Sequence, residues 1–249
     1  MIKNMHYLNL RYNKKTTLQR AIKWIFLAFF IFILVTCVSS PQKDKDNAEH
    51  QKGIDYYSQI ISINPENVEA YKKRAEYYCR LNLYQEALKD LNIAIRLSAD
   101  NDMLFAMRSY VYSFLEHHQD ALKDANKAIE INPKNMIAYY NRGVSYFFLG
   151  QNEEALADLN LCVEFEPNET INRFSRSKIY CDMKRYEEAL EDLNYAIKID
   201  PNLLVFYKRR GAVYKKLAEN ANDETMSEMY RQKSDTDFSI AESLNSEMR

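Results

Sequence analysis

The stretch Met136–Asn168, MIAYYNRGVSYFFLGQNEEALADLNLCVEFEPN, decides the fold that the sequence predicts. In its first half, Tyr139, Gly143 and Tyr146 recur at spacings of four and three residues, as residues on one face of an α-helix do. Gly150 comes shortly afterwards, and glycine suits the left-handed residue with which many helices end. The first half therefore predicts an amphipathic helix that stops near Gly150.

The second half of the stretch keeps the same helical spacing. Ala155, Leu159 and Cys162 lie four and three residues apart, and Pro167 ends the pattern. Proline has no amide hydrogen to donate and disfavours helix in the residue before it. Because Gly143 and Ala155 are both small, the two predicted helices can approach closely. We expect an antiparallel pair of helices joined by a short turn.

The whole pattern recurs with a period of 34 residues. The residues that close the units are Pro65, Ala99, Pro133, Pro167 and Pro201. The small residues of the second helices are Ala87, Ala121, Ala155 and Ala189. The aromatic residues near the ends of the first helices are Tyr78, Tyr112, Tyr146, Tyr180 and Tyr214. Asn67, Asn101 and Asn135 fall where a side chain should cap the next helix.

A 34-residue helix–turn–helix unit with these residues resembles the tetratricopeptide repeat (TPR). The unit that matches best carries Tyr139, Gly143, Tyr146, Ala155 and Pro167, and the resemblance covers roughly residues 48–245. It implies an all-α fold, an α-solenoid in which stacked hairpins form a right-handed superhelix. The departures from the pattern are Arg173 in place of an aromatic residue, Ser109 and Ser177 in place of glycine, and Ala99 in place of proline.

The repeats divide the chain into segments. Residues 1–40 are a basic leader followed by an apolar segment, 41–47 are a polar linker, and 48–67 are a half repeat. Four full units are expected at 68–101, 102–135, 136–169 and 170–203. Residues 204–249 are a degenerate fifth unit, in which 11 additional residues are expected to enlarge the turn before a capping helix.

Charge is distributed unevenly along the chain. Residues 1–40 contain six basic residues and no acidic one, so 28 of the 34 basic residues and all 35 acidic residues lie in 41–249. The formal charge of this repeat body is therefore about −7. Nucleic-acid binding depends on neutralising phosphates with basic side chains, so no nucleic-acid partner is expected.

The N-terminal segment combines basic residues with the apolar run Trp24–Val38, as export signals and membrane anchors do. Fifteen helical residues span roughly 22 Å, less than the ~30 Å hydrocarbon core of a bilayer, although residues 21–38 would extend the run. The sequence Leu34-Val35-Thr36-Cys37 resembles a bacterial lipoprotein signal, which makes Cys37 a candidate for lipidation. A cleaved signal, a lipidated Cys37 and a retained anchor are all open alternatives. In each case the basic leader should stay in the cytoplasm and the repeats should lie outside it.

Two charged series follow the same period. The arginines are Arg74, Arg108, Arg142, Arg176 and Arg210. The aspartates are Asp90, Asp124, Asp158, Asp192 and, after the insertion, Asp237. An arginine stripe could bind anions, but a buried arginine without a partner is costly and an acid is present in every unit. We therefore expect each arginine to pair with an aspartate of a neighbouring helix.

By resemblance, the first helix of each unit lines a concave groove. We expect about half of the aromatic residues on these helices to lie in the core between units. The others are the expected partner-binding residues: Tyr110, Phe114, Tyr140, Phe148 and Phe174. Basic residues flank them at both ends of the groove: Lys72, Lys73 and Arg80 at one end, and Lys208, Arg209, Lys215 and Lys216 at the other. Such a surface suits a peptide or protein segment.

The sequence shows no catalytic constellation. It has no glycine-rich phosphate loop, and His117 and His118 are adjacent in a turn without a third metal ligand nearby. Cys79, Cys162 and Cys181 form no metal-binding motif and are expected to be packing residues. We expect no enzyme activity, no cofactor and no metal. The hypothesis is a membrane-tethered scaffold for protein–protein binding in the bacterial cell envelope. The alternatives are a cytosol-facing anchored receptor or co-chaperone, and an accessory subunit of an enzyme complex.

Overall fold

The computed structural model of the protein describes residues 41–247, and this part of the chain contains eleven α-helices and no strand. Residues Glu49–Arg249 form one compact unit, distinct from Met1–Ala48. The predicted all-α class is confirmed. None of the helices between Pro41 and Glu247 is long and apolar enough to cross a membrane. The predicted anchor segment 21–38, including Cys37, lies outside the described residues.

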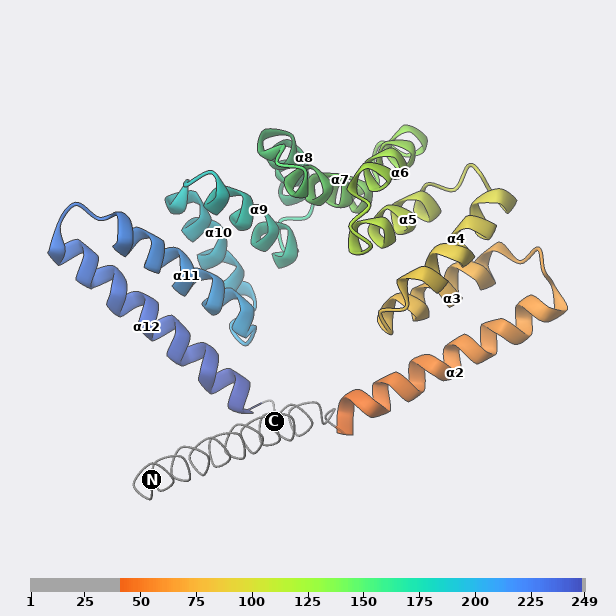
Figure 1. The fold of residues 1–249 in the computed structure, drawn as a ribbon, viewed down its shortest axis with the longest axis horizontal. Coiled ribbons are helices and arrows are strands. Elements are labelled where there is room, and N and C mark those ends of the chain that lie inside the picture. The colour runs from red at the N-terminus through yellow and green to blue at the C-terminus, as the bar shows by residue number, and fades with distance from the viewer. Residues whose placement is uncertain (1–40, 248–249) are drawn as a thin grey trace, which may run out of the picture. The chain divides into compact units, whose positions relative to one another are not determined.

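One helix, α2 (Pro41–Ile63), precedes five helical hairpins (Figure 1). The hairpins are α3 (Val68–Arg80) with α4 (Tyr84–Leu97), α5 (Asp102–Phe114) with α6 (His118–Ile131), α7 (Met136–Phe148) with α8 (Asn152–Phe165), α9 (Thr170–Asp182) with α10 (Tyr186–Ile199), and α11 (Leu204–Asn220) with α12 (Glu224–Glu247). We call α3, α5, α7, α9 and α11 the first helices, and their partners the second helices. The first helices begin at the residues where the sequence places the start of each unit.

Residues 41–47, for which the sequence predicts a polar linker, are the first turns of α2. From Gly53 onward α2 packs on α3 as a second helix would. A Cβ atom at Gly53 would lie 2.5 Å from the ring of Tyr77, and Tyr57 lies beside the same ring with centroids 6.0 Å apart. The half repeat therefore covers the side of α3 that has no preceding hairpin to pack against.

Asparagine side chains start three of the first helices. Asn67, Asn101 and Asn135 each accept a hydrogen bond from a backbone N–H group in the first turn of α3, α5 and α7. These contacts satisfy donors that would otherwise have no partner at a helix N-terminus. The predicted caps are confirmed, whereas Glu169 and Leu203, which precede α9 and α11 at the same position, form no side-chain cap.

The turn inside each of the first four hairpins has one residue in the left-handed region. These residues are Asn82 (φ 59°), Glu116 (φ 61°), Gly150 (φ 77°) and Lys184 (φ 60°). The next residue in each turn donates its backbone N–H to the carbonyl of the tyrosine at Tyr78, Tyr112, Tyr146 or Tyr180. This bond is the closing contact of a Schellman motif. The prediction for Gly150 is confirmed, and the other three turns reach the same conformation without glycine.

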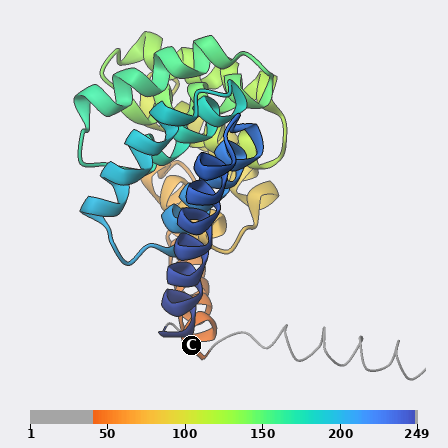
Figure 2. The same cartoon turned by 90° about the vertical axis from the view of Figure 1, so that its left-hand side faces the viewer.

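The fifth hairpin differs from the expectation of an enlarged turn. Only three residues, Ala221–Asp223, connect its helices, as in the other hairpins. The additional residues lengthen the helices instead: α11 has 17 residues where α9 has 13. Asp237 is residue 14 of α12, whereas Asp192 is residue 7 of α10. Extensions of four and seven residues are close to whole helical turns, so the same faces stay in contact. The lengthened helices pack side by side (Figures 1 and 2).

Small residues let the helices of a hairpin approach closely. A Cβ atom at Gly143 would lie 3.3 Å from the carbonyl oxygen of Ala155 and 3.2 Å from Cβ of Asp158. Ala155 and Leu159, opposite this glycine, are fully buried. The expected close approach at Gly143 and Ala155 is confirmed.

Each arginine of the series joins three helices. In the third hairpin, Arg142 Nε and Nη2 donate to the two carboxylate oxygens of Asp158 on α8, at 2.8 Å each. Arg142 Nη1 donates to Asn126 Oδ1 on α6, in the preceding hairpin, at 2.8 Å. The other joints are Ser58–Arg74–Asp90, Asn92–Arg108–Asp124, Asn160–Arg176–Asp192 and Asn194–Arg210–Asp237. The predicted arginine–aspartate pairing is confirmed, and the asparagine partners extend it to the neighbouring unit.

Arg173 fills the place of an aromatic residue by stacking. In the first three hairpins the joint arginine lies beside two aromatic rings of its own helix, as Arg142 does with Tyr139 and Tyr146. In the fourth hairpin Arg173 lies 3.9 Å from the ring centroid of Tyr195 on α10 and also donates to Asp192 at 3.2 Å. A guanidinium group over an aromatic ring thus takes the place of the aromatic residue, and the pairing of Arg176 with Asp192 is kept.

The three described cysteines are packing residues of the solenoid. Burial raises the pKa of Cys79 to about 11 and that of Cys162 to about 12, from an ordinary value of 9.0. Burial also raises the pKa of Cys181. None of the three forms a disulfide. Thiols of this kind are protonated at neutral pH and are poor nucleophiles.

The aspartates should be essential to stability because each accepts two hydrogen bonds from a largely buried arginine. We expect Asp158→Ala to lower the free energy of unfolding by about 2–4 kcal/mol, since it leaves Arg142 with an unpaired charge. Urea unfolding followed by circular dichroism measures this change. Asp120→Ala, which removes the exposed partner of Lys123, is the control and should leave the midpoint unchanged. Equal effects of the two substitutions would contradict the assigned role of the joint.

The cysteine pKa values predict slow alkylation of the folded protein. At pH 8 the thiolate fraction of Cys162 should be roughly a thousandfold lower than that of an ordinary thiol, because its pKa is about three units higher. Iodoacetamide labelling with peptide mass spectrometry follows each cysteine separately. The rate should rise with pH well above pH 8 and should become ordinary in urea. Rapid labelling of Cys162 in the folded protein would show that the packing around it is wrong.

Candidate functional site

The first helices lie on the inner side of the stack within Glu49–Arg249 (Figure 1). Successive first helices also contact each other, α5 with α7 and α7 with α9, which brings this side of the hairpins together. Three adjoining cavities, of about 600, 300 and 260 Å³, open between α7, α9 and α11. Arg209 lines all three, and we call the combined surface the α7–α11 groove.

The α7–α11 groove has an apolar part on the α7 side. Tyr140, Val144, Phe147 and Phe148 line the cavity of about 300 Å³. The hydroxyl groups of Tyr140 and Ser175 form a hydrogen bond of 2.9 Å, which ties α7 to α9. Burial raises the pKa of Tyr140, so its hydroxyl stays protonated and fixed at neutral pH. These rings provide a preformed apolar surface on a rigid hairpin.

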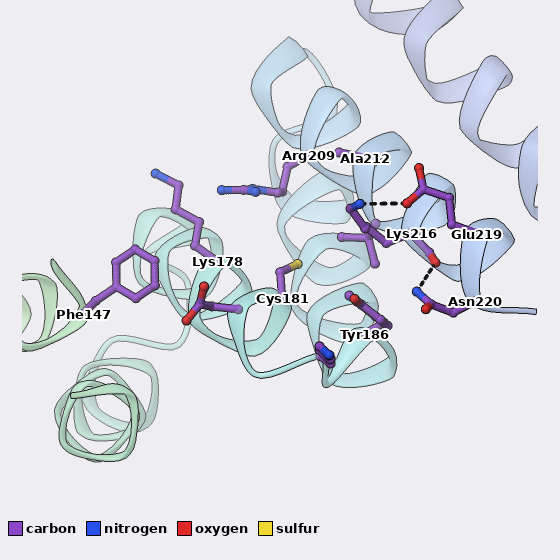
Figure 3. Close-up of a pocket in the computed structure, with 12 residues that line it drawn as sticks. Phe147, Lys178, Cys181, Tyr186, Arg209, Ala212, Lys216, Glu219 and Asn220 are labelled. Atoms are coloured by element: carbon purple, nitrogen blue, oxygen red, sulfur yellow. Dashed lines mark hydrogen bonds and ion pairs between the residues drawn. The ribbon is translucent and has the colours of Figure 1, made fainter. Parts of the chain in front are cut away.

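Two cations border this apolar part (Figure 3). Lys178 reaches from α9 and Arg209 from α11, and no salt bridge to an acidic side chain is found for either within residues 44–246. Lys178 Nζ lies 4.6 Å from the ring centroid of Phe174. Burial, and secondarily the charge of Arg209, lowers the pKa of Lys178. Asp182, one turn beyond Lys178, instead accepts a hydrogen bond from Asn152 Nδ2 at 2.7 Å.

The first hairpin shows the opposite arrangement. Lys72 and Lys73 on α3 pair with Glu69 (2.6 Å) and Glu76 (2.9 Å), one turn away on the same helix. Lys73 and Arg209 occupy the same position in their units, four periods apart. Ala212 stands where Glu76 would be needed to neutralise Arg209. Arg209 therefore differs from Lys72 and Lys73, which are neutralised, and from Lys216 at its own end of the groove, which pairs with Glu219 at 2.7 Å.

Two of the expected groove residues form a separate aromatic cluster. Tyr110 and Phe114 on α5 lie with ring centroids 4.7 Å apart, and Phe114 stacks on Tyr84 at 4.8 Å. Burial raises the pKa of Tyr110 to about 12. Phe114 is 52 % exposed, so this cluster keeps an accessible apolar edge, but it lines none of the three cavities of the α7–α11 groove.

The other three expected residues, Tyr140, Phe148 and Phe174, line the α7–α11 groove. Phe148 is 61 % exposed and stacks on His118, with centroids 4.8 Å and planes 3° apart. This contact corresponds by position to that of Phe114 with Tyr84. The structure thus divides the five expected residues between two surfaces and adds Phe147, Lys178 and Arg209 to the second one.

A further set of apolar residues was missed by the sequence analysis. Ile137, Ile171 and Val205 are the second residues of α7, α9 and α11, and each is between 44 and 48 % exposed. They recur at 34 residues like the other series, and that period was the available signal. Val205 contributes to the cavity that Phe174 and Arg209 also line.

The histidines of the second hairpin do not gather metal ligands. His118 stacks on Phe148, and the ring of His117 lies 6.1 Å from that of Tyr112. Among the residues that the structure describes, no group of three or more His, Cys, Asp or Glu side chains could hold a metal ion.

Comparison with known proteins gives matches to repeat families and to solved solenoids. Models of the tetratricopeptide repeat match residues 104–135 and 125–157, and a TPR repeat model matches residues 178–217. No curated protein has significant sequence similarity to the chain.

Three solved structures illustrate the structural similarity. YrrB, described as a TPR protein with an unusual peptide-binding site, is 21 % identical over 76 % of this chain and 91 % of its own, with a TM-score of 0.53. A tetratricopeptide repeat protein from Parabacteroides merdae is 20 % identical over 82 % and 75 %, with a TM-score of 0.63. A thermophilic TPR protein from Thermus thermophilus is 21 % identical over 67 % and 91 %, with a TM-score of 0.60. At these identities the similarity concerns the fold.

The period, the hairpins and the stacked arrangement agree with the family models over the central part of the chain. The chain is therefore an α-solenoid whose residues 104–157 and 178–217 match models of the tetratricopeptide repeat, an architecture that supports protein–protein interaction.

Proposed function

We propose that the protein is a membrane-tethered scaffold that binds a protein or peptide segment along its concave side, with the repeats outside the cytoplasm of a bacterial cell. The observation that carries the binding role is the α7–α11 groove, in which the exposed ring of Phe148 and several half-buried aromatic rings adjoin the unpaired cations Lys178 and Arg209. Catalysis is not part of this proposal.

The aromatic residue Phe148 supports binding because it is held in place and already accessible. Phe148 keeps 61 % of its surface exposed although a stacked ring fixes one of its faces. Burying such a ring against a partner gives favourable free energy with little loss of side-chain freedom. The peptide-binding site named for YrrB offers a precedent on a similar fold.

The tether is supported by the sequence alone. Six basic residues and no acidic residue lie within 1–40, and the uncharged run Trp24–Val38 follows the basic part. A basic flank tends to remain in the cytoplasm, so the chain beyond the apolar run would lie on the other side. A tether would raise the concentration of the solenoid near membrane-associated partners.

The groove assignment predicts a specific loss of binding. Peptides selected from a random display library on the full-length protein in detergent should bind at least tenfold more weakly to Phe148→Ala, because truncating an aromatic anchor at a binding hot spot commonly costs about 2 kcal/mol or more. Fluorescence anisotropy with the synthetic peptides measures the affinities.

Phe165→Ala is the matched control for this experiment. Phe165 is 64 % exposed, slightly more than Phe148, but lies at the end of α8 and lines none of the three cavities. Affinity should be unchanged in this variant. If both variants bind like the original protein, or lose affinity equally, the concave assignment fails.

The tether predicts a definite chemical state of the N-terminus. Mass spectrometry of the protein from bacterial membranes should find either an acylated Cys37 or an intact apolar segment, and externally added protease should digest the repeats of spheroplasts. A soluble protein cleaved after the apolar run would contradict the tether. Repeats that are cut only after the spheroplasts are lysed would favour the cytosol-facing alternative.

A further inference from the structure

The α7–α11 groove joins an apolar cavity to a pair of cations, and this combination restricts what can bind there. The rings of Tyr140, Phe147 and Phe148 lie on one side of the groove, and Lys178 and Arg209 border it. A purely apolar ligand would leave both cations without partners as it covered them. Covering an unpaired charge is costly, so the ligand should supply an acceptor of opposite charge.

The two cations are unpaired for different reasons: the helix of Arg209 has no acid one turn away, whereas Asp182, one turn beyond Lys178, accepts a hydrogen bond from Asn152 instead. Lys73 in the first hairpin is neutralised by Glu76, whereas Arg209 at the same position in the fifth hairpin has Ala212 one turn later. Lys178 occupies the position of Glu76 in the fourth unit, so a cation replaces the acid there. Within a repeat body of about −7, positive charge is thus exposed on the inner side of α9 and α11.

The shape of the groove favours a chain that continues in both directions. Arg209 lines all three cavities, which extend toward Phe148 on α7, toward Lys216 near the end of α11, and toward Val205 at its start. A segment could therefore enter and leave past Arg209. Polyphosphate ligands fit less well, because aromatic rings adjoin the cations, Asp182 and Glu219 also line the groove, and the body as a whole is acidic.

We propose that the α7–α11 groove binds an internal peptide segment in which an aromatic or large aliphatic side chain is followed closely by Asp or Glu. The apolar side chain occupies the cavity lined by Tyr140, Val144 and Phe148, and the carboxylate contacts Lys178 and Arg209. This inference rests on the proposed function and specifies the partner by its chemistry.

The key variant is Ala212→Glu. A glutamate at this position is placed to pair with Arg209 as Glu76 pairs with Lys73, so the substitution neutralises the groove and removes no existing contact. Lys178→Met is a second variant, which keeps an unbranched stem over Phe174 but removes the charge. Lys73→Gln is the matched control, since it removes an already paired cation from the same unit position as Arg209. Circular dichroism checks that all variants remain folded.

The experiment has two stages on the full-length protein in detergent. Random 12-residue peptides are selected by display, and we expect enrichment of Asp or Glu near an aromatic or aliphatic residue. Selected peptides are then synthesised with blocked ends and measured by fluorescence anisotropy. Ala212→Glu and Lys178→Met should weaken binding at least tenfold, and Lys73→Gln less than twofold. Replacing the peptide's acids by their amides should cause a similar loss, after which Ala212→Glu should have little further effect.

Several outcomes would overturn the inference. Selected peptides without acids that still depend on Phe148 would leave the proposed function intact and refute only the peptide class. If a free C-terminal carboxylate were required, the ligand would be a chain end instead of an internal segment. Arg209-dependent binding of single-stranded DNA or of phosphatidylglycerol vesicles, without binding of blocked peptides, would assign the cations to phosphate. If no peptide binds in a Phe148-dependent way, the proposed function itself fails.

Discussion

The joint formed by one arginine, one aspartate and an asparagine (a serine in the first joint) is the interaction on which the solenoid depends. Arg142 pairs with Asp158 inside its hairpin and with Asn126 of the hairpin before it, so one side chain fixes both the internal geometry of a unit and its angle to the previous one. A guanidinium group is suited to this role because its donors form a rigid planar fork. Repetition of the joint from Arg74 to Arg210 gives successive hairpins the same relation, as a solenoid stabilised by nearest-neighbour contacts requires.

Because the joints and the small residues hold the stack together, residues on the inner side are free to vary. The position before each joint arginine illustrates this freedom, since it holds Lys73, Met107, Asn141, Ser175 and Arg209 in turn. Asn141 uses it to bond the carbonyl of Ala106 on the preceding first helix, at 2.8 Å. Lys73 forms a pair with Glu76. Only at Arg209 does the position offer a cation that no acid within the described residues neutralises. A difference in function along the groove thus requires no change in the fold.

The sequence predicts most of the fold because the determinants are periodic. Residue spacing alone predicts the helices, the asparagine caps at Asn67, Asn101 and Asn135, and the pairing of arginines with aspartates. It did not indicate the third partner of each joint, which is Ser58 in the first joint and an asparagine in the other four, since Asn126 reaches Arg142 only when hairpins are stacked. It also suggested an enlarged turn in the fifth unit, because the sequence does not show whether inserted residues lengthen the helices or the turn.

The groove was predicted less completely. Exposed aromatic residues could be listed, but neutralisation of Lys73 and stacking of Phe148 on His118 depend on side-chain geometry.

The fifth hairpin shows how the joint directs a side chain into the groove. Adjacent residues on a helix point about 100° apart, so fixing one fixes its neighbour. Arg210 is held toward α10 and α12 by Asn194 and Asp237, and Arg209 must therefore project to another face of α11. The eleven inserted residues could have rotated α12 and displaced Asp237. They did not, because four residues were added to α11 and seven to α12, each close to a whole number of turns. The orientation of Arg209 in the α7–α11 groove thus follows from the same contact that terminates the stack.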